Sequence, residues 1–151
     1  GGIPYTNFRF LVNDGFENSV SSYVVTMDVR PDSDDDGMPD AWEALYGLNP
    51  TNAADAASHL DSDPFTCGEE YIADTDPTNT ASCFRIDSFS TNTVYFDSSS
   101  NRLYSLLLST NLAEGIWTSA APARMGIGGN DSLTHTNAAP VEFYKLEVEL
   151  P

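Results

Sequence analysis

The sequence predicts an α+β chain, mainly antiparallel β, built as a small sandwich or barrel with an inserted module of two loops and two short helices. Short segments rich in β-branched and aromatic residues, separated by polar turns, occupy both ends of the 151-residue chain. The stretch between them, residues 31–82, carries 13 of the 23 acidic residues and none of the six basic ones. Apolar residues such as Trp42 and Tyr71 recur through this acidic run and argue against disorder.

Residues 1–30 are predicted to form a pair of strands. Residues 8–12 and 23–29 are rich in strand-forming side chains, and the turn signal Asn13-Asp14-Gly15 lies between them. Two strands alone are marginally stable in water. We therefore expect this pair either to pack on the rest of the chain or to be the end of a separate sandwich domain.

Residues 83–151 are predicted to form a small β domain. The expected strands cover residues 84–86, 93–96, 102–109, 117–119, 124–127 and 142–150. In the last of these, apolar residues alternate with polar ones, as one packed face of a strand requires. Two clusters of Gly, Ser, Asn and Asp, at residues 97–101 and 128–131, predict turns.

The acidic segment 32–43 has the ligand spacing of an EF-hand loop, which predicts a calcium site. Acids occupy loop positions one, three, five, nine and twelve, glycine occupies position six, and a backbone carbonyl is available at position seven: Asp32, Asp34, Asp36, Asp40, Glu43, Gly37 and Met38, respectively. Calcium takes six to eight oxygen ligands, and the long glutamate can reach back with both oxygens from the first turn of a helix. That helix is expected over residues 40–46, ending at Gly47.

A second, altered loop is predicted at residues 59–70. With Glu70 as position twelve, Asp61 and Asp63 take positions three and five, and Phe65 offers a carbonyl at position seven. His59 would stand at position one, where imidazole is a poor ligand for a hard ion, so a solvent-facing role is favoured for it. Pro64 replaces the glycine and cannot adopt a positive φ. We expect this loop to be weaker or rebuilt, with Asp55 or Asp76 completing its ligands, so that one or two Ca²⁺ ions bind.

The motifs of residues 32–80 resemble the thrombospondin type 3-like and dockerin-like calcium repeats of large secreted bacterial proteins. They are Asp-x-Asp-x-Asp-Gly-Met-Pro-Asp-x-Trp-Glu, then Tyr-Gly-Leu-Asn-Pro at 46–50, then Glu-Tyr-Ile-Ala-Asp-Thr-Asp-Pro at 70–77. The amino-terminal strand pair is similar to the end of an immunoglobulin-like or cadherin-like repeat, and residues 102–146 resemble a small carboxy-terminal β module. The resemblance implies paired calcium loops, each followed by a short helix, in a non-catalytic module that is secreted or displayed on the cell surface beside other domains.

Cys67 and Cys83 permit one disulfide, which is the pairing we predict. Cys67 falls at position nine of the second loop, where a thiol would be a poor calcium ligand. Cys83 opens the carboxy-terminal region, so a bridge would pin the acidic module to the β domain.

Enzymatic activity is not expected. The chain lacks the Gly-x-Ser-x-Gly pattern of a nucleophile elbow, and His135 lies in a polar segment. The alternative function is that of a carbohydrate-binding accessory module of a polysaccharide-degrading enzyme, with Trp117 and Tyr104 as glycan contacts, although aromatic residues of small β domains more often form the core. Nucleic acid is excluded as a partner by a net charge of −17, and no apolar run is long enough to span a membrane.

Overall fold

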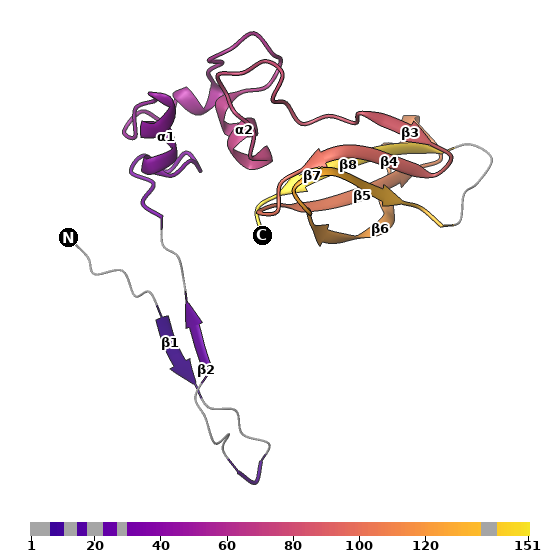
Figure 1. Ribbon diagram of the computed structural model, residues 1–151, viewed down its shortest axis with the longest axis horizontal. Coiled ribbons are helices and arrows are strands. Elements are labelled where there is room, and N and C mark those ends of the chain that lie inside the picture. Colours follow the sequence, from indigo (N-terminus) through magenta and orange to yellow (C-terminus); the bar gives the residue numbers. More distant parts are fainter. Residues whose placement is uncertain (1–6, 11–14, 18–22, 27–29, 137–141) are drawn as a thin grey trace.

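The computed structural model describes residues 7–10, 15–17, 23–26, 30–136 and 142–151, and shows a small α+β fold (Figure 1). Two antiparallel sheets of three strands each stand beside a module with two short helices. No helix in the described ranges is long and apolar enough to cross a membrane.

The predicted amino-terminal strand pair is present. Strand β1 (Asn7–Phe10) runs antiparallel to β2 (Tyr23–Thr26), with Asn7 opposite Thr26. Among the described strands these two make a sheet of their own. The outer parts of the expected strands, residues 11–12 and 27–29, and most of the predicted turn lie outside the described residues.

The six strands from β3 to β8 form a two-layer sandwich. One sheet has the strand order β3-β4-β7 and the other β6-β5-β8. The bounds are Ser88–Ser90 for β3, Thr93–Ser98 for β4, Leu103–Ser109 for β5, Thr118–Met125 for β6, Gly129–Thr134 for β7 and Phe143–Glu149 for β8. A short 3-10 helix, η2 (Leu112–Glu114), joins β5 to β6.

The core of the sandwich lies between the two sheets. Val94 and Phe96 of β4 and Leu133 of β7 meet Tyr104 and Leu106 of β5, and all five are buried. Tyr144, Leu146 and Val148 of β8 pack against this cluster, which confirms the alternation predicted for the last strand.

Three of the predicted strand boundaries were wrong. The segment 84–86 is not a strand, since the first strand of this region begins at Ser88, and the segments 117–119 and 124–127 both overlap the single strand β6 (Thr118–Met125). Residues 129–131, predicted as a turn, belong to β7, where Asp131 faces inward and pairs with Arg124 of β6 at 3.0 Å. This ion pair, in which Asp131 is buried and Arg124 is partly exposed, helps to explain why a polar, glycine-containing segment forms a strand.

Between the strand pair and the sandwich lies the acidic module. It contains α1 (Asp40–Tyr46), the 3-10 helix η1 (Asp55–Ala57) and α2 (Cys67–Ala73). Helix α1 has the predicted bounds and ends at Gly47, whose φ of 76° is the left-handed conformation that glycine adopts without strain. Helix α2 begins with a capping box between Thr66 and Glu69 and ends at Asp74, also left-handed.

A small core holds the module together. Met38 of the first loop packs with Cys67 and Tyr71 of α2, and Trp42, Leu48 and Ala56 surround them. Because these residues come from the first loop, α1, η1 and α2, the two halves of the module fold against each other.

Arg102 joins the module to the sandwich. Arg102 is 5% exposed, and its guanidinium donates hydrogen bonds to the carbonyls of Tyr71 and Ile72, each at 2.7 Å. The last carbonyls of a helix have no partner within it, so this side chain caps α2 from the turn before β5. Asp74 adds an ion pair with Arg102 and accepts a hydrogen bond from Ser99. A hollow beside this joint is lined in part by Ile72, Phe84 and Val148.

Candidate metal centre

The carboxylates of the first loop converge on one point. Asp32, Asp34 and Asp36 turn inward and are half-buried, whereas Ser33 and Asp35 between them are exposed. The three inward residues can each place one carboxylate oxygen within 4.8 Å of the others. This is the arrangement that the alternating spacing predicts.

Hydrogen bonds within the first loop fix this shape. Asp32 accepts from the backbone N–H groups of Asp36 and Gly37, at 3.3 and 3.0 Å, and Asp36 accepts from that of Met38 at 2.8 Å. Gly37 has a φ of 94°, so the glycine at position six makes the sharp turn expected of it.

Asp40 closes the loop from the start of α1. Its two carboxylate oxygens accept from the backbone and the hydroxyl of Ser33, at 2.7 and 2.8 Å. It does not belong to the converging groups found among the described acids. Its contacts are with the backbone and the side chain of Ser33, so the ligand role predicted for Asp40 remains a prediction.

Glu43 completes the first site from inside the module. Its side chain is fully buried, and neither of its carboxylate oxygens has a hydrogen-bond partner among the described residues. Burial, followed by the nearby charges of Asp34, Asp36 and Asp55, raises the pKa of Glu43 to about 7. An ionised carboxylate in such surroundings is costly unless a cation or donors compensate it.

Asp55 stands with the first site, not the second. One of its carboxylate oxygens lies within 4.8 Å of ligand atoms of Asp36 and Glu43. The expectation that Asp55 completes the second loop was therefore wrong. The reason is that η1 folds back toward the first loop, where the Asp55 carboxylate accepts from the backbone N–H of Asn49 at 2.8 Å.

The second loop has the predicted register but a different backbone. Asp61, Asp63 and Glu70 offer carboxylate oxygens within 4.8 Å of one another. Asp63 accepts from the backbone N–H of Phe65 at 2.8 Å, the same bond between positions seven and five that Met38 and Asp36 make in the first loop. Among the described residues, none of this loop has the positive φ seen at Asp35 and Gly37. With Pro64 in place of glycine, this loop is rebuilt, as expected.

Glu70 is the counterpart of Glu43. It is 1% exposed, and its carboxylate accepts a hydrogen bond from the Thr75 hydroxyl that is long at 3.3 Å. Burial, followed by the charges of Asp63 and Asp61, raises its pKa to about 7. One oxygen of Asp61 and one of Asp63 are also buried without a partner.

His59 and Asp76 take other roles. His59 is exposed, as favoured, but its Nδ1 lies 2.7 Å from the carbonyl oxygen of Phe65, the oxygen predicted as a ligand. Asp76 accepts hydrogen bonds from the hydroxyl and backbone N–H of Thr78, and these bonds lower its pKa. It is not part of the second group of carboxylates, so the ligand role predicted for Asp76 remains a prediction.

No family model, curated protein or solved structure matches this chain. The resemblance to thrombospondin type 3-like and dockerin-like repeats remains a prediction from the motif residues.

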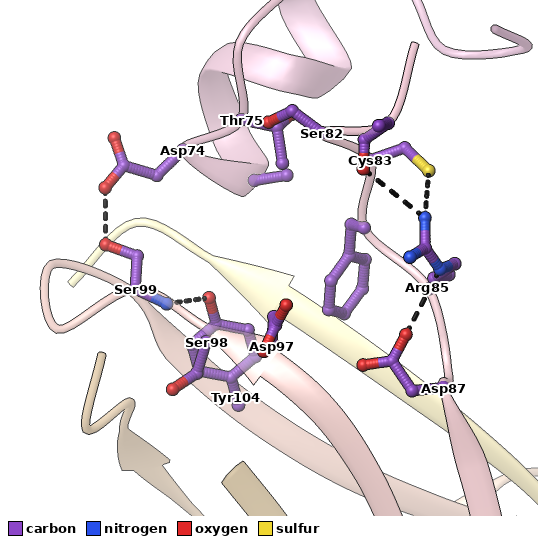
Figure 2. Close-up of a pocket in the computed structure, with 13 residues that line it drawn as sticks. Asp74, Thr75, Ser82, Cys83, Arg85, Asp87, Asp97, Ser98, Ser99 and Tyr104 are labelled. Atoms are coloured by element: carbon purple, nitrogen blue, oxygen red, sulfur yellow. Dashed lines mark hydrogen bonds and ion pairs between the residues drawn. The ribbon is translucent and has the colours of Figure 1, made fainter. Parts of the chain in front are cut away.

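The predicted disulfide is absent, because both cysteines are free. Cys67 is the first residue of α2 and is buried against Met38 and Tyr71. Cys83 lines a polar pocket at the other end of that helix, beside Ala73 and Asp74, where its sulfur lies 3.1 Å from the Arg85 guanidinium (Figure 2). Cys67 is thus engaged in the module core at the start of α2 and Cys83 lies beside Arg85 beyond the end of that helix, and the two are not paired.

One of the two predicted glycan contacts was wrong. Tyr104 is 1% exposed and belongs to the sandwich core, where its hydroxyl accepts from the backbone N–H of Ser99 at 2.7 Å. Trp117 is half-buried, with the Lys145 ammonium 6.0 Å from its ring.

Two roles could not be predicted from sequence patterns, namely that of Asp55 in the first site and that of Arg102 as a helix cap. The place of Asp55 in the first site lay outside any loop spacing, and nothing local to Arg102 indicates that it caps a helix 30 residues earlier. The one signal for Arg102 was indirect, since the adjoining acidic stretch has no cation of its own.

Proposed function

We propose that residues 31–82 bind two Ca²⁺ ions and that the chain is a calcium-stabilised, non-enzymatic structural or interaction module. The observation that carries the proposal is the environment of the Glu43 carboxylate. This carboxylate is fully buried, both oxygens lack a hydrogen-bond partner in the described part of the chain, and the carboxylates of Asp36 and Asp55 face it. Fixed negative charges packed this closely repel one another, and a cation at their centre would convert the repulsion into attraction.

The donor set favours calcium among the biological cations. All the converging groups are carboxylates, which are hard ligands that suit Ca²⁺, Mg²⁺ and Mn²⁺ rather than soft metals. Calcium accepts more oxygens and looser geometry than magnesium, which demands a near-ideal octahedron and keeps its waters. A site with carboxylates from a loop, a helix and η1 is rich in oxygens and fits the larger ion. Within this proposal, the carbonyls of Met38 and Phe65 add one ligand to each ion.

We also propose that the protein works outside the cell. Extracellular calcium modules bind with a Kd of about 10⁻⁴ to 10⁻³ M, which suits millimolar surroundings. The motif resemblance favours a secreted or cell-surface bacterial protein with neighbouring domains as partners. Of the two glycan contacts predicted for the carbohydrate-binding alternative, only Trp117 is left, because Tyr104 is buried.

Calcium titration of the whole chain tests this function. After removal of divalent ions, isothermal titration should give two bound Ca²⁺ per chain, with Mg²⁺ binding much more weakly. Calcium at tens of times its Kd should raise the free energy of unfolding by about 2 kcal/mol for each site, because the ion binds the folded state. The double variant Glu43→Gln, Glu70→Gln should lose both effects. A wild-type protein whose melting temperature is the same in chelator and in millimolar calcium would refute the proposal.

A further inference from the structure

Asp55 links the first site to the start of the second loop. It lies 12 residues beyond Glu43, outside the first loop, in η1. One of its oxygens, Oδ2, accepts from the backbone N–H of Asn49, and the other, Oδ1, is buried without a partner. The anchored oxygen orients the carboxylate, which leaves Oδ1 available to a cation shared with Asp36 and Glu43.

We propose that Asp55 is a ligand of the first calcium ion and that, through it, filling the first site raises the affinity of the second. The inference rests on the calcium binding proposed above. The position of Asp55 just before the second loop indicates a ligand of the second ion, whereas the geometry places it at the first. In this arrangement η1 is the element that couples the two ions.

The contacts of η1 provide the physical connection. Ala56, next to Asp55, lies against Gly68 of α2 so closely that a Cβ added at Gly68 would be 3.2 Å from the Ala56 carbonyl oxygen. The carbonyl of Ser58 accepts from the backbone N–H of Cys67 at 2.9 Å, and the Ser58 hydroxyl lies 3.4 Å from the Cys67 sulfur. Residues on both sides of Asp55 are therefore tied to the first turn of α2.

That first turn carries the second site. Glu70 follows Cys67 on α2, and the second loop begins at His59, directly after Ser58. An ion that holds Asp55 thus fixes the start of the second loop and, through Gly68 and Cys67, the helix that presents Glu70.

Ordering explains why the second ion should bind more tightly. A flexible site must lose conformational entropy when it binds, and a first ligand that has already ordered the segment removes part of that loss. The second loop should need such ordering more than the first, because position one of this loop is a histidine and its turn lacks glycine. Coupling between two binding events is reciprocal, so the second ion must tighten the first by the same factor.

The experiment is isothermal calcium titration of the full chain, in wild type and four variants. Glu70→Gln and Glu43→Gln remove one site each and isolate the affinity of the other. Asp55→Asn removes the proposed ligand charge and keeps an oxygen for the Asn49 N–H. Gly68→Ala disturbs the contact between η1 and α2 without touching a carboxylate. Asp35→Asn, an exposed acid of the first loop, is the matched control for charge.

We expect each site to bind at least about fivefold more tightly when the other is filled, within the usual range for coupled sites. Asp55→Asn should weaken the first site at least about tenfold, also in the Glu70→Gln background, and Asp35→Asn should change it less than about threefold. Gly68→Ala should keep two bound ions and bring the coupling factor towards one, with the circular dichroism of the sandwich unchanged.

The outcomes separate the two proposals. Wild-type protein that binds no calcium would end both. Two ions bound with a coupling factor of one would overturn the coupling and leave the proposed function in place. A single ion in wild type would overturn the coupling and would also reduce the proposed function to one calcium site. An Asp55→Asn variant with wild-type affinity at the first site would overturn the ligand role of Asp55.

Discussion

Glu43 and Glu70 occupy equivalent places in the two halves of the module. Each is the fourth residue of a seven-residue helix, each is fully or almost fully buried, and each faces two or more aspartates. Their positions could be predicted from loop spacing, because the twelfth residue of such a loop must enter the following helix. Asp55 could not be assigned in this way, because its approach depends on how η1 folds back.

The raised pKa values lead to a pH prediction: the metal-free protein should be more stable at pH 5.5 than at pH 8. Burial, followed by aspartate charges, raises the pKa of both glutamates from 4.5 to about 7. Between these values the folded chain keeps protons that the unfolded chain releases. The stabilising contribution is complete below pH 4.5 and is lost as the pH rises through about 7. Urea unfolding should show a loss of up to about 1.4 kcal/mol per pH unit for each glutamate.

Two comparisons test whether this pH dependence of stability comes from Glu43 and Glu70. The double variant Glu43→Gln, Glu70→Gln should flatten it, because neither amide titrates. Saturating calcium should reverse it, since the ion requires ionised carboxylates and competes with protons. Equal or greater stability of the metal-free wild type at pH 8 would contradict the raised pKa values.

Asp34 and Asp35 offer a neighbouring pair with opposite exposure. Asp34 turns inward and both of its carboxylate oxygens are buried without partners, whereas Asp35 points to solvent. We expect Asp34→Asn to lower calcium affinity at the first site by tenfold or more, about 1.4 kcal/mol. Asp35→Asn removes the same charge and should change affinity less than about threefold. Similar losses for the two variants, measured by titration, would mean that net charge alone attracts the ion.

At the scale of elements, local patterns predicted helix α1 and the last strand best. Helix α1 has its apolar residues, its acidic first turn and its terminal glycine within one short segment. Strand β8 alternates along its length and packs its apolar face on the core. In both, local preference and tertiary packing agree, so the sequence alone was sufficient.

The errors came from segments that tertiary pairing overrides. Strand β6 contains Pro122, which argues for a break, but β6 is an edge strand of its sheet and can hold a proline there. Its pairing with β5 shifts register across that residue, between Tyr104 and Leu106. Strand β7 contains turn-forming residues, but Asp131 is buried against Arg124 of β6. Neither feature can be recognised from neighbours in sequence.

The capping box of α2 gives a prediction for one element. Thr66 accepts from the Glu69 backbone at 3.3 Å, and the Glu69 carboxylate accepts from the Thr66 backbone at 2.9 Å. Thr66→Ala should cost about 1 kcal/mol in the free energy of unfolding, because N–H groups at the start of α2 lose a partner. It should also weaken the second calcium site more than the first, since that helix presents Glu70.

Thr80→Ala is the matched control, because Thr80 is exposed in a turn beyond α2. Its effect on unfolding should stay within about 0.5 kcal/mol. If Thr66→Ala weakens the two calcium sites equally in titration, the cap does not act through α2 alone.

At the scale of the whole molecule, Arg102 decides whether the module and the sandwich unfold together. Arg102→Met would leave the Tyr71 and Ile72 carbonyls without their donor and Asp74 without its ion pair. We expect a cost of about 3 kcal/mol, typical of breaking a buried charged contact. Arg85→Met, which removes an exposed arginine paired with Asp87, is the control and should cost much less stability than Arg102→Met.

The two tryptophans allow each half to be followed separately. Trp42 packs in the module core and Trp117 lies directly before β6. Variants with one tryptophan replaced by phenylalanine would report urea unfolding from the other in saturating calcium. Wild type should show coincident transitions, and Arg102→Met should separate them. Coincident transitions in Arg102→Met would show that other contacts hold the halves together.

The makeup of this joint determines how it would fail under a pulling force. Its named contacts are directed hydrogen bonds and an ion pair, and the apolar side chains of Ile72, Phe84 and Val148 line a hollow beside them. Hydrogen bonds weaken steeply with small changes in distance and angle, whereas apolar contacts have no preferred direction. The joint should therefore be stiff but brittle. Under tension, the calcium-filled module and the sandwich would part abruptly as intact bodies, before either core opens, and rejoin when the tension is released.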